Sequence, residues 1–282
     1  MSDAKIAQGK VTVSKSLVAT FDLLGISSLM LNSTEDNLNK LADSLHEVYG
    51  LTTTKLREIM QKHSQACEHN GARQILDRIR EAISFNVFSD TIVASMRLDQ
   101  RYIEEQFSKF DFSVEYENLF RGHAVYIFLR MIETIANILF SSGFPARGCI
   151  DIGPMYWEKD LVVGQPYVNA LKCADKLEFS GVVFTDDAKK FCDEQVKTIK
   201  DPDCEFGSLQ LEVPTKGGML TLPCLNWIYN DMDFSKQSTD LRQLLVERFS
   251  EHGKTMNASV WDKLENTERT IRAFMIQNKS LS

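Results

Sequence analysis

The first regular pattern along the chain is an alternation of polar and apolar positions over residues 11–24. Thr20 and Asp22 fall on the more polar face of this segment, whereas Ala19 and Phe21 fall on the apolar face. Because side chains of a strand point alternately to opposite faces, the pattern predicts a β-strand with Asp22 near its end. The glycine and serines of residues 25–28 then favour a turn, and helical periodicity over 38–48 follows.

The rest of the chain alternates between helices and strand pairs. Helices are predicted over residues 54–68, 73–82, 115–140 and 166–179 and from residue 186. Strands are predicted over residues 83–88, 91–96, 147–154, 160–164 and 182–184, with an antiparallel pair inside 206–227. Two helices up to about residue 277 complete the order. We expect one catalytic domain, residues 1–230, and a C-terminal helical extension, residues 231–282, packed on it.

Composition narrows the class of protein. With 43% hydrophobic and 25% charged residues among 282, the chain has an average globular composition. No segment is expected to reach the apolar length of a membrane span, because Arg130 and Glu133 interrupt the apolar stretch 125–140. No secretion signal is visible at the N-terminus, and the six cysteines form no Cys-x-x-Cys pair, so we expect a cytoplasmic protein with reduced thiols.

A net charge of -7 disfavours a nucleic-acid partner but still allows a small anion bound through a metal ion. Asp22 at the end of the first strand and Asp90 in the turn of the next strand pair can converge if that pair packs beside the first strand. Carboxylate oxygens are the ligands that Mg²⁺ and Mn²⁺ prefer. The backbone N–H groups of Gly25, Ile26 and Ser27 begin a helix and could bind phosphate oxygens. An ordinary turn and an ordinary helix cap would explain the same aspartates.

Four motifs in order resemble the catalytic domain of class III nucleotidyl cyclases. Residues 18–29 (VATFDLLGISSL) are similar to the first metal motif, and residues 88–92 (FSDTI) to the second. Residues 147–154 (RGCIDIGP) and 162–164 (VVG) resemble the later strand hairpin, and residues 168–170 and 176–178 resemble the helix that follows. Each motif alone is weak, but together they span residues 11–188 in the family's order.

The resemblance implies a ferredoxin-like α+β fold with a mostly antiparallel sheet flanked by helices. It implies that Asp22 and Asp90, with the Leu23 carbonyl, bind two Mg²⁺ or Mn²⁺ ions per site. The ribose 3′-hydroxyl of a nucleoside triphosphate would attack the α-phosphate, giving a 3′,5′-cyclic monophosphate and pyrophosphate. It also implies a homodimer with two composite sites, in which the helix around Asn169 completes the partner's site.

Two departures from the family pattern point to a subgroup. The family's transition-state Arg, four residues after Asn169, is replaced by Cys173, so Lys172 or Lys176 would supply the positive charge. Asn86 stands where adenylyl cyclases carry an adenine-reading Lys, and its amide does not fix the base. The missing Arg, the Phe-Ser-Asp-Thr form of the second motif at residues 88–91 and the long helical insertion between the motifs together resemble the pyrimidine cyclases of bacterial antiphage systems. This resemblance implies UTP, or less favourably CTP, as substrate. A separate effector protein would then read the cyclic nucleotide as an alarm.

Several alternatives remain open at this stage. An adenylyl or guanylyl cyclase with altered base contacts fits the same motifs, and a palm-type polymerase or diguanylate cyclase also places carboxylates on a first strand and a hairpin. A catalytically inactive cyclase-like module that binds nucleotide or a protein is supported by the missing helix Arg. Arg147 and Asp151 could line the pocket or could simply pair on the strand face, and the second reading is favoured.

Overall fold

The computed structural model describes residues 13–26, 30, 34–66, 79–88, 90–98, 114–158, 161–199, 206–228 and 241–281. Its strands are β1 (Ser14–Leu23), β2 (Ile83–Phe88), β3 (Thr91–Arg97), β4 (Ala146–Glu158), β5 (Leu161–Gly164), β6 (Gly181–Phe184), β7 (Ser208–Thr215) and β8 (Gly218–Leu225). Its α-helices are α2 (Glu35–Ala66), α5 (Val114–Ser141), α6 (Gln165–Lys176), α7 (Asp186–Val196), α9 (Leu241–Ser250) and α10 (Ala258–Leu281). Two 3₁₀ turns, η1 (Lys197–Ile199) and η2 (Glu251–Gly253), follow α7 and α9.

The strands form one sheet in the order β2-β3-β1-β4-β6-β8-β7, and β5 pairs with β4. The β4–β6 pair is parallel, and the other pairs are antiparallel. The predicted α+β class with a mostly antiparallel sheet is therefore confirmed. β1 lies at the centre, with β3 along one edge and β4 along the other, as Asp22 and Asp90 require if they are to meet.

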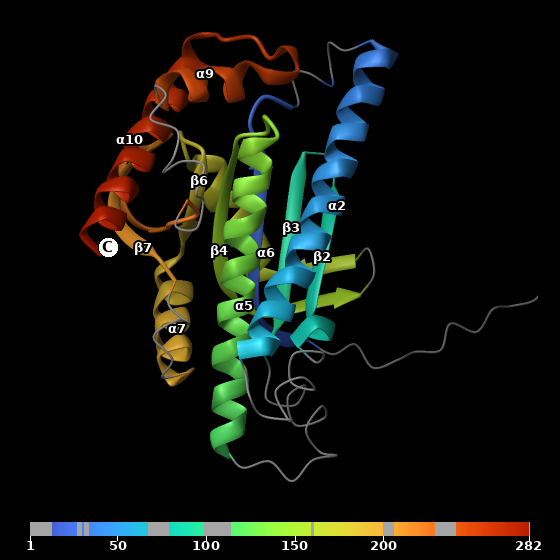
Figure 1. Ribbon diagram of the computed structural model, residues 1–282, viewed down its shortest axis with the longest axis vertical. Helices are drawn as coiled ribbons and strands as arrows, with labels where there is room; N and C mark the ends of the chain where they lie inside the picture. Colours follow the sequence, from blue (N-terminus) through green and yellow to red (C-terminus); the bar gives the residue numbers. More distant parts are fainter. Residues whose placement is uncertain are drawn as a thin grey trace, which may run out of the picture.

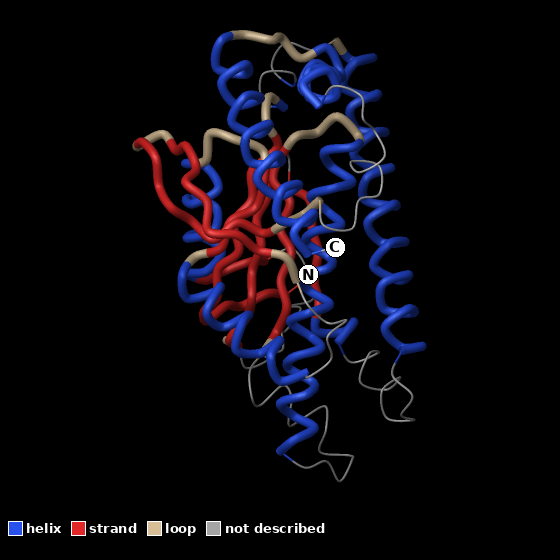
Figure 2. Tube along the Cα trace, turned by 60° about the vertical axis from the view of Figure 1, so that its left-hand side comes forward, coloured by secondary structure: helices blue, strands red, loops and turns tan. Residues whose placement is uncertain are grey.

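Helices cover both faces of this sheet (Figure 2). The long helices α2 and α5 pack against each other, and they run along the same side of the sheet in Figure 1. On the other face, α6 packs across β1 and β4. The face that carries Leu17, Ala19 and Phe21 joins the main hydrophobic core, whereas Val18 belongs to a smaller apolar cluster with Val93. The alternation read from β1 therefore matches two covered faces, of which the α6 face is the more polar.

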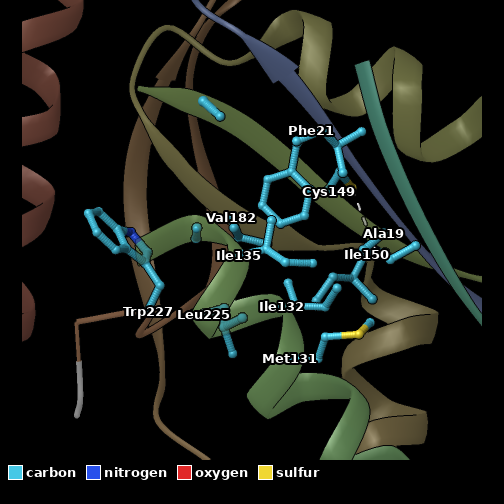
Figure 3. Close-up of a cluster of buried hydrophobic side chains, with 14 of the residues drawn as sticks. Ala19, Phe21, Met131, Ile132, Ile135, Cys149, Ile150, Val182, Leu225 and Trp227 are labelled. Carbon is cyan, nitrogen blue, oxygen red and sulfur yellow. Dashed lines mark hydrogen bonds between the residues drawn. The ribbon is translucent and has the colours of Figure 1, made fainter. Parts of the chain in front are cut away.

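The centre of the main core lies between α5 and the middle strands (Figure 3). Phe21 of β1 and Ile150 of β4 are fully buried there, beside Ile132 and Ile135 of α5. The close approach of β1 and β4 depends on Gly148, because a Cβ at that position would lie 3.0 Å from the Phe21 ring. The aromatic ring of Phe21 thus fills the space that any larger residue at position 148 would need.

The observed helices differ from the predicted ones in two places. Residues 38–48 and 54–68, predicted as two helices, form the single helix α2, because Gly50 and the threonines that follow it do not break the helix. α6 ends at Lys176 instead of residue 179, since Leu177 is extended and pairs with Thr215 of β7. Most of the predicted helix 73–82 lies outside the described residues. Its described part, residues 79–82, is helical.

The expectation that no segment reaches the apolar length of a membrane span is wrong for α5. Residues Phe120–Ser141 are long and apolar enough to cross a membrane by length and composition. In this fold 67% of the apolar window is buried within the protein, and α5 packs against α2 and α7. α5 is thus the buried core helix that its interruption by Arg130 and Glu133 predicted.

α10 packs against β7 at the edge of the sheet, and α9 packs against α10 (Figure 1). The fully buried Thr267 of α10 accepts a hydrogen bond from the Ser180 N–H at 2.8 Å and donates one to the Lys263 carbonyl at 2.7 Å. Lys263 in turn pairs with Glu178 at 2.8 Å. These contacts join α10 to the segment between α6 and β6.

Glu133 gives the core a pH-dependent element. It is buried in α5 and pairs with Arg130, and one of its oxygens has no hydrogen-bond partner within the described part of the chain. Burial raises the pKa of Glu133 to about 7, and the charge of Arg130 offsets only part of this shift. The folded state therefore holds a proton that the unfolded state releases as pH rises above the usual glutamate pKa, so the native state loses stability from about pH 4.5 to 7.

Glu133→Gln should remove this loss. Relative to the native protein, the unfolding free energy of the variant should increase by about 2 kcal/mol between pH 5 and pH 8. Urea unfolding of both proteins at the two pH values measures this difference. A gap that stays constant with pH would show that Glu133 is ionised in the folded state throughout this range.

Candidate functional site

The candidate metal-binding aspartates lie at one end of the sheet. Asp22 is opposite Thr91 of β3 and Arg147 of β4, and the Leu23 N–H donates to the Asp90 carbonyl at 2.9 Å. This hydrogen bond places the turn that carries Asp90 directly beside the end of β1. The sequence argument required the strand pair β2–β3 to pack next to β1, and the structure has this arrangement.

Arg147 is the hub of the site. Its Nε donates to Asp22 Oδ2 at 2.6 Å, and its Nη2 donates to Asp175 Oδ1 at 2.9 Å. Its Nη1 donates to the carbonyls of Asp175 and Leu177 at 2.7 and 3.1 Å, where α6 ends. One guanidinium thus joins the metal-motif strand to the last turn of α6. The planar fork of donors suits Arg to this task better than the single ammonium of Lys.

A cavity of about 550 Å³ opens beside this hub. Its wall combines the end of β1 and the following turn with α6, the β7–β8 turn and α10. The lining residues are Asp22, Leu23, Leu24, Gly25, Arg147, Leu171, Asp175, Glu178, Lys216 and Lys263. Three cations and three carboxylates thus line one cavity.

The charges in the cavity are paired with one another. Asp175 Oδ1 accepts from Lys216 at 2.8 Å as well as from Arg147. These two cations lower the pKa of Asp175, with the Lys216 hydrogen bond as the larger cause. An incoming anion would therefore meet Arg147 and Lys216 through the exchange of existing ion pairs.

The turn after β1 carries the residues predicted to bind phosphate. Gly25 lines the cavity with φ 82°, a backbone conformation that favours glycine. The Leu24 N–H donates to the Pro145 carbonyl at 2.9 Å, which anchors the turn to the loop before β4. Ile26 is buried in the core, so it could contribute to a ligand only through its backbone. Ser27 lies outside the described residues.

The predicted catalytic residues of α6 lie on its outer side. Pro166, Ala170 and Ala174 form the buried face of the helix. Asn169, Lys172 and Lys176 are exposed, whereas Leu171 and Asp175 line the cavity of the same chain. The three predicted residues share one helical face as expected, but that face does not line the cavity beside Asp22.

Cys173, which occupies the position of the family's Arg, points inward to Cys149 of β4. The Cys149 thiol hydrogen-bonds to Cys173 and lowers the pKa of Cys173, while burial raises the pKa of Cys149 well above the usual thiol value. No cation from position 173 is therefore available on α6.

Asn86 lies on the same sheet face as Asp22. One row of cross-strand partners runs through Asn86, Val93, Thr20 and Cys149. The next row on the same face of the sheet runs through Thr91 and Asp22. Two strand spacings separate Asn86 from β1, which is about 10 Å. Asn86 does not line the described cavity, so a ligand would have to extend along the sheet to meet both residues.

The donor set at the end of β1 suits a hard divalent cation. Asp22 and Asp90 belong to adjoining segments, and the Leu23 backbone lies between them at the wall of the cavity. Oxygen donors alone are what Mg²⁺ and Mn²⁺ require, and both ions commonly keep water and substrate oxygens as further ligands. Among the described residues no group of three or more His, Cys, Asp or Glu could hold a metal ion, so substrate oxygens would have to complete the coordination.

Sequence reasoning did not assign site roles to Asp175, Glu178, Lys216 and Lys263. Lys216 falls within the predicted antiparallel pair of residues 206–227 and Lys263 within the predicted helical extension, and neither position indicates a ligand. The alternation within β4 put Arg147 on the correct face, but its partners proved to be Asp22 and Asp175. Asp151 instead accepts a hydrogen bond from Thr185 at 2.6 Å. The positions of Lys216 and Lys263 in the cavity wall depend on the long-range packing of the β7–β8 hairpin and α10, which no local sequence motif indicates.

Comparisons with known proteins find likenesses in structure. No family model matches the sequence, and no curated protein matches it. Among solved structures the chain is similar to the crystal structure of the catalytic core of a rhodopsin-guanylyl cyclase with converted specificity in complex with ATPαS. The TM-score is 0.38 at 10% sequence identity, and the match covers 77% of this chain and 98% of that chain.

Arg147→Lys tests whether the hub requires a guanidinium. Arg147 makes four hydrogen bonds from three nitrogen atoms, whereas the three N–H groups of an ammonium share one nitrogen. Lysine therefore leaves buried acceptors without partners, and the variant should be destabilised by about 2 kcal/mol. Arg242→Lys is the matched control, because its pairs with Glu265 and Glu268 are exposed. Chemical denaturation should show a change below about 0.5 kcal/mol for the control. Equal effects of the two changes would contradict the assignment of Arg147 as the hub.

Proposed function

We propose that this protein is a metal-dependent nucleotidyl cyclase. The observation that carries the proposal is that Asp22 lines a cavity together with Arg147, Lys216 and Lys263, while the turn that carries Asp90 is bonded to the neighbouring Leu23 of the same wall. Asp90 itself does not line the cavity. The cavity volume is in the range of small-molecule sites. Carboxylates for divalent ions next to cations for phosphate oxygens are the two requirements of phosphoryl chemistry on a nucleoside triphosphate.

In this proposal each side chain has a separate task. Asp22, Asp90 and the Leu23 carbonyl hold two Mg²⁺ or Mn²⁺ ions, which would lower the pKa of the attacking 3′-hydroxyl and neutralise charge on the leaving pyrophosphate. Arg147 and Lys216 exchange their bonds to Asp175 for bonds to phosphate oxygens. The amides after Gly25 bind the phosphate chain at the start of the following helix.

The outer side of α6 supports a composite site in a homodimer. Asn169, Lys172 and Lys176 are exposed together, and the apolar side chains of Leu161, Val163 and Val168 are exposed on β5 and α6 beside them. A second copy packed on this surface would bury the apolar residues and receive the three polar ones. In such a dimer Lys172 or Lys176 replaces the Arg of the family helix.

The substrate we propose is a pyrimidine nucleotide, UTP before CTP, and its cyclic product would act as an antiphage alarm for an effector protein. The support lies in the sequence features already described, above all FSDT at residues 88–91, Cys173 at the Arg position and Asn86 at the base-reading position. An adenylyl or guanylyl cyclase would use the same metal site. The base is therefore decided by assay with all four nucleotides.

The decisive assay incubates the protein with each nucleoside triphosphate and Mn²⁺ and separates the products by chromatography. We expect cyclic UMP as the main product. Asp22→Ala and Asp90→Ala should each reduce turnover at least about 100-fold without unfolding the protein, because each removes a proposed ligand of the ions needed for chemistry. Asp22→Ala also removes a partner of Arg147, so its folding is checked alongside its activity. Asp36→Ala, an exposed acidic residue in the first turn of α2, is the control.

The absence of any cyclic nucleotide from the native protein would refute the enzymatic proposal. Full activity in either aspartate variant would remove that residue from the metal role. A main product from ATP or GTP would keep the cyclase and replace the pyrimidine assignment.

Mixing two inactive variants tests the composite site. Asp22→Ala and Lys176→Ala proteins, co-expressed in equal amounts, should recover about one quarter of native activity. Half of the dimers would then be mixed, and each mixed dimer would contain one intact site. The same mixture of Asp22→Ala with Asp90→Ala should stay inactive, because both changes affect the same half of each site. No recovery in the first mixture would contradict a composite site that includes Lys176.

A second candidate function is a catalytically inactive module that binds nucleotide. The ion pair of Asp22 with Arg147 and the inward-facing Cys173 favour it, since both reduce the groups available for catalysis. Thermal stabilisation by nucleotide without product formation would identify this module.

A further inference from the structure

The C-terminal extension reaches the loop behind the metal motif. Between α9 and α10, the His252 ring stacks on Phe144 with 4.3 Å between centroids and an interplanar angle of 11°. Its Nε2 lies 2.9 Å from the Ser142 carbonyl oxygen. Glu251 occupies the space beside Gly143, where a Cβ would lie 2.3 Å from its carboxylate. Residues 251–252 therefore fit closely onto the turn between α5 and β4.

Lys254 continues this contact toward the site. Its Nζ donates to the Gly143 carbonyl at 2.5 Å and lies 5.4 Å from the centroid of the Phe144 ring. Burial lowers the pKa of Lys254 to about 8, and the nearby Glu251 carboxylate offsets part of this shift. The ammonium is thus mostly charged at neutral pH, although it is largely removed from water.

The stem of Lys254 lies against the turn that follows β1. A Cβ built at Gly25 would be 3.4 Å from Lys254 Cδ, which is ordinary van der Waals contact. The same turn is tied to the 142–145 loop through the hydrogen bond from the Leu24 N–H to the Pro145 carbonyl. The stem of Lys254 therefore lies beside the turn, over the side of Gly25 where a side chain would stand, and its ammonium holds the loop that anchors the turn.

The supported turn forms part of the cavity wall. Leu24 and Gly25 line the cavity together with Asp22, whereas Lys254 does not line it. α10, which starts four residues after Lys254, contributes Lys263 to the same wall. The extension thus supports the turn from behind and contributes to the cavity directly.

We propose that Lys254 is a positioning residue that fixes the Leu24–Gly25 turn for nucleotide binding, so that the C-terminal extension is an integral part of the site. This inference rests on the proposed function only in naming the nucleotide as ligand. The ordering of the turn by Lys254 is a property of the folded chain, with or without ligand.

The test compares Lys254→Met with Lys189→Met in the full-length protein. Methionine retains an apolar stem against Gly25 but cannot donate to the Gly143 carbonyl. Lys189 is a close match, because its Nζ donates to Asp193 at 2.5 Å and lies 5.5 Å from the Phe206 ring, on α7 away from the cavity. Both variants thus lose a partly buried ammonium that lies over an aromatic ring.

Hydrogen exchange at the Leu24 amide is the direct readout. Because this N–H donates to the Pro145 carbonyl, loosening of the loop should speed its exchange by about tenfold in Lys254→Met and leave it unchanged in Lys189→Met. Lys254→Gln keeps a hydrogen-bond donor on a shorter stem, so it should show an intermediate rate. It also serves as the variant for comparison if the methionine protein does not fold. Equal exchange in the Lys254 and Lys189 variants would overturn the proposal.

Kinetics then connect the turn to the site. The Lys254 variant should raise KM for the Mn²⁺-nucleotide by about tenfold with a smaller change in kcat, since the turn binds phosphate and takes no part in proton transfer. The Lys189 control should change neither constant. A loosened turn with an unchanged KM would also overturn the proposal. Native protein that forms no product would refute the proposed function instead, and the exchange comparison would still decide whether Lys254 orders the turn.

Discussion

The pairing of β1 on both of its edges is the constraint on which the rest of the structure depends. Ten residues of β1 pair with β4 and seven pair with β3, and both ladders reach Asp22. A slip of one residue would reverse every side chain, so Phe21 would leave the core and Asp22 would enter it. The burial of Leu17, Ala19 and Phe21 against α5 therefore fixes the face on which Asp22 meets Arg147.

The charges that line the cavity explain how an acidic protein could bind an anionic substrate. Three cations are offset by three carboxylates within the wall, so the cavity has little net charge of its own. Under the proposed function, two divalent ions would contribute four positive charges against the roughly four negative charges of a triphosphate. A net charge of -7 is then no obstacle to an anionic substrate, because the metal ions and not the protein surface provide the compensation.

Local sequence patterns predicted the strands and helices that form the centre of the fold. The alternation in residues 11–24 placed Asp22 on the correct face, and the β-branched stretch at residues 91–96 indicated the strand that carries Asp90 to it. Only part of the cavity wall could be predicted from the sequence. Lys216 and Lys263 come from a hairpin and a helix whose packing depends on contacts between residues far apart in the sequence. Two predicted helices merged into α2 because helix propagation continued through Gly50.

The candidate site residues likewise divide into those that local sequence patterns indicate and those that depend on long-range packing. Asp22 lies near the end of one apolar strand and Asp90 directly before another, so the local sequence pattern indicates both aspartates. The sheet face on which Arg147 lies follows from the alternation within β4. The roles proposed for Asn169, Lys172 and Lys176 would depend on a second chain, and the pattern of one helix indicates only that the three residues share a face. The contact of Lys254 with Gly25 has no local signature at all, because a glycine and a lysine stem meet only through the completed fold.

The hold of Lys254 on the first turn has a consequence for the order of folding. Domains acquire structure from the N-terminus while the chain is being synthesised, and contacts between distant residues form late because the entropy of closing the intervening loop opposes them. The central strands can pair before the last helices exist, but the turn next to Asp22 receives its support only after residue 254 has been added. Nascent chains would therefore carry the aspartates before the cavity wall is complete, and a chain that ends before residue 254 would lack the support of this turn.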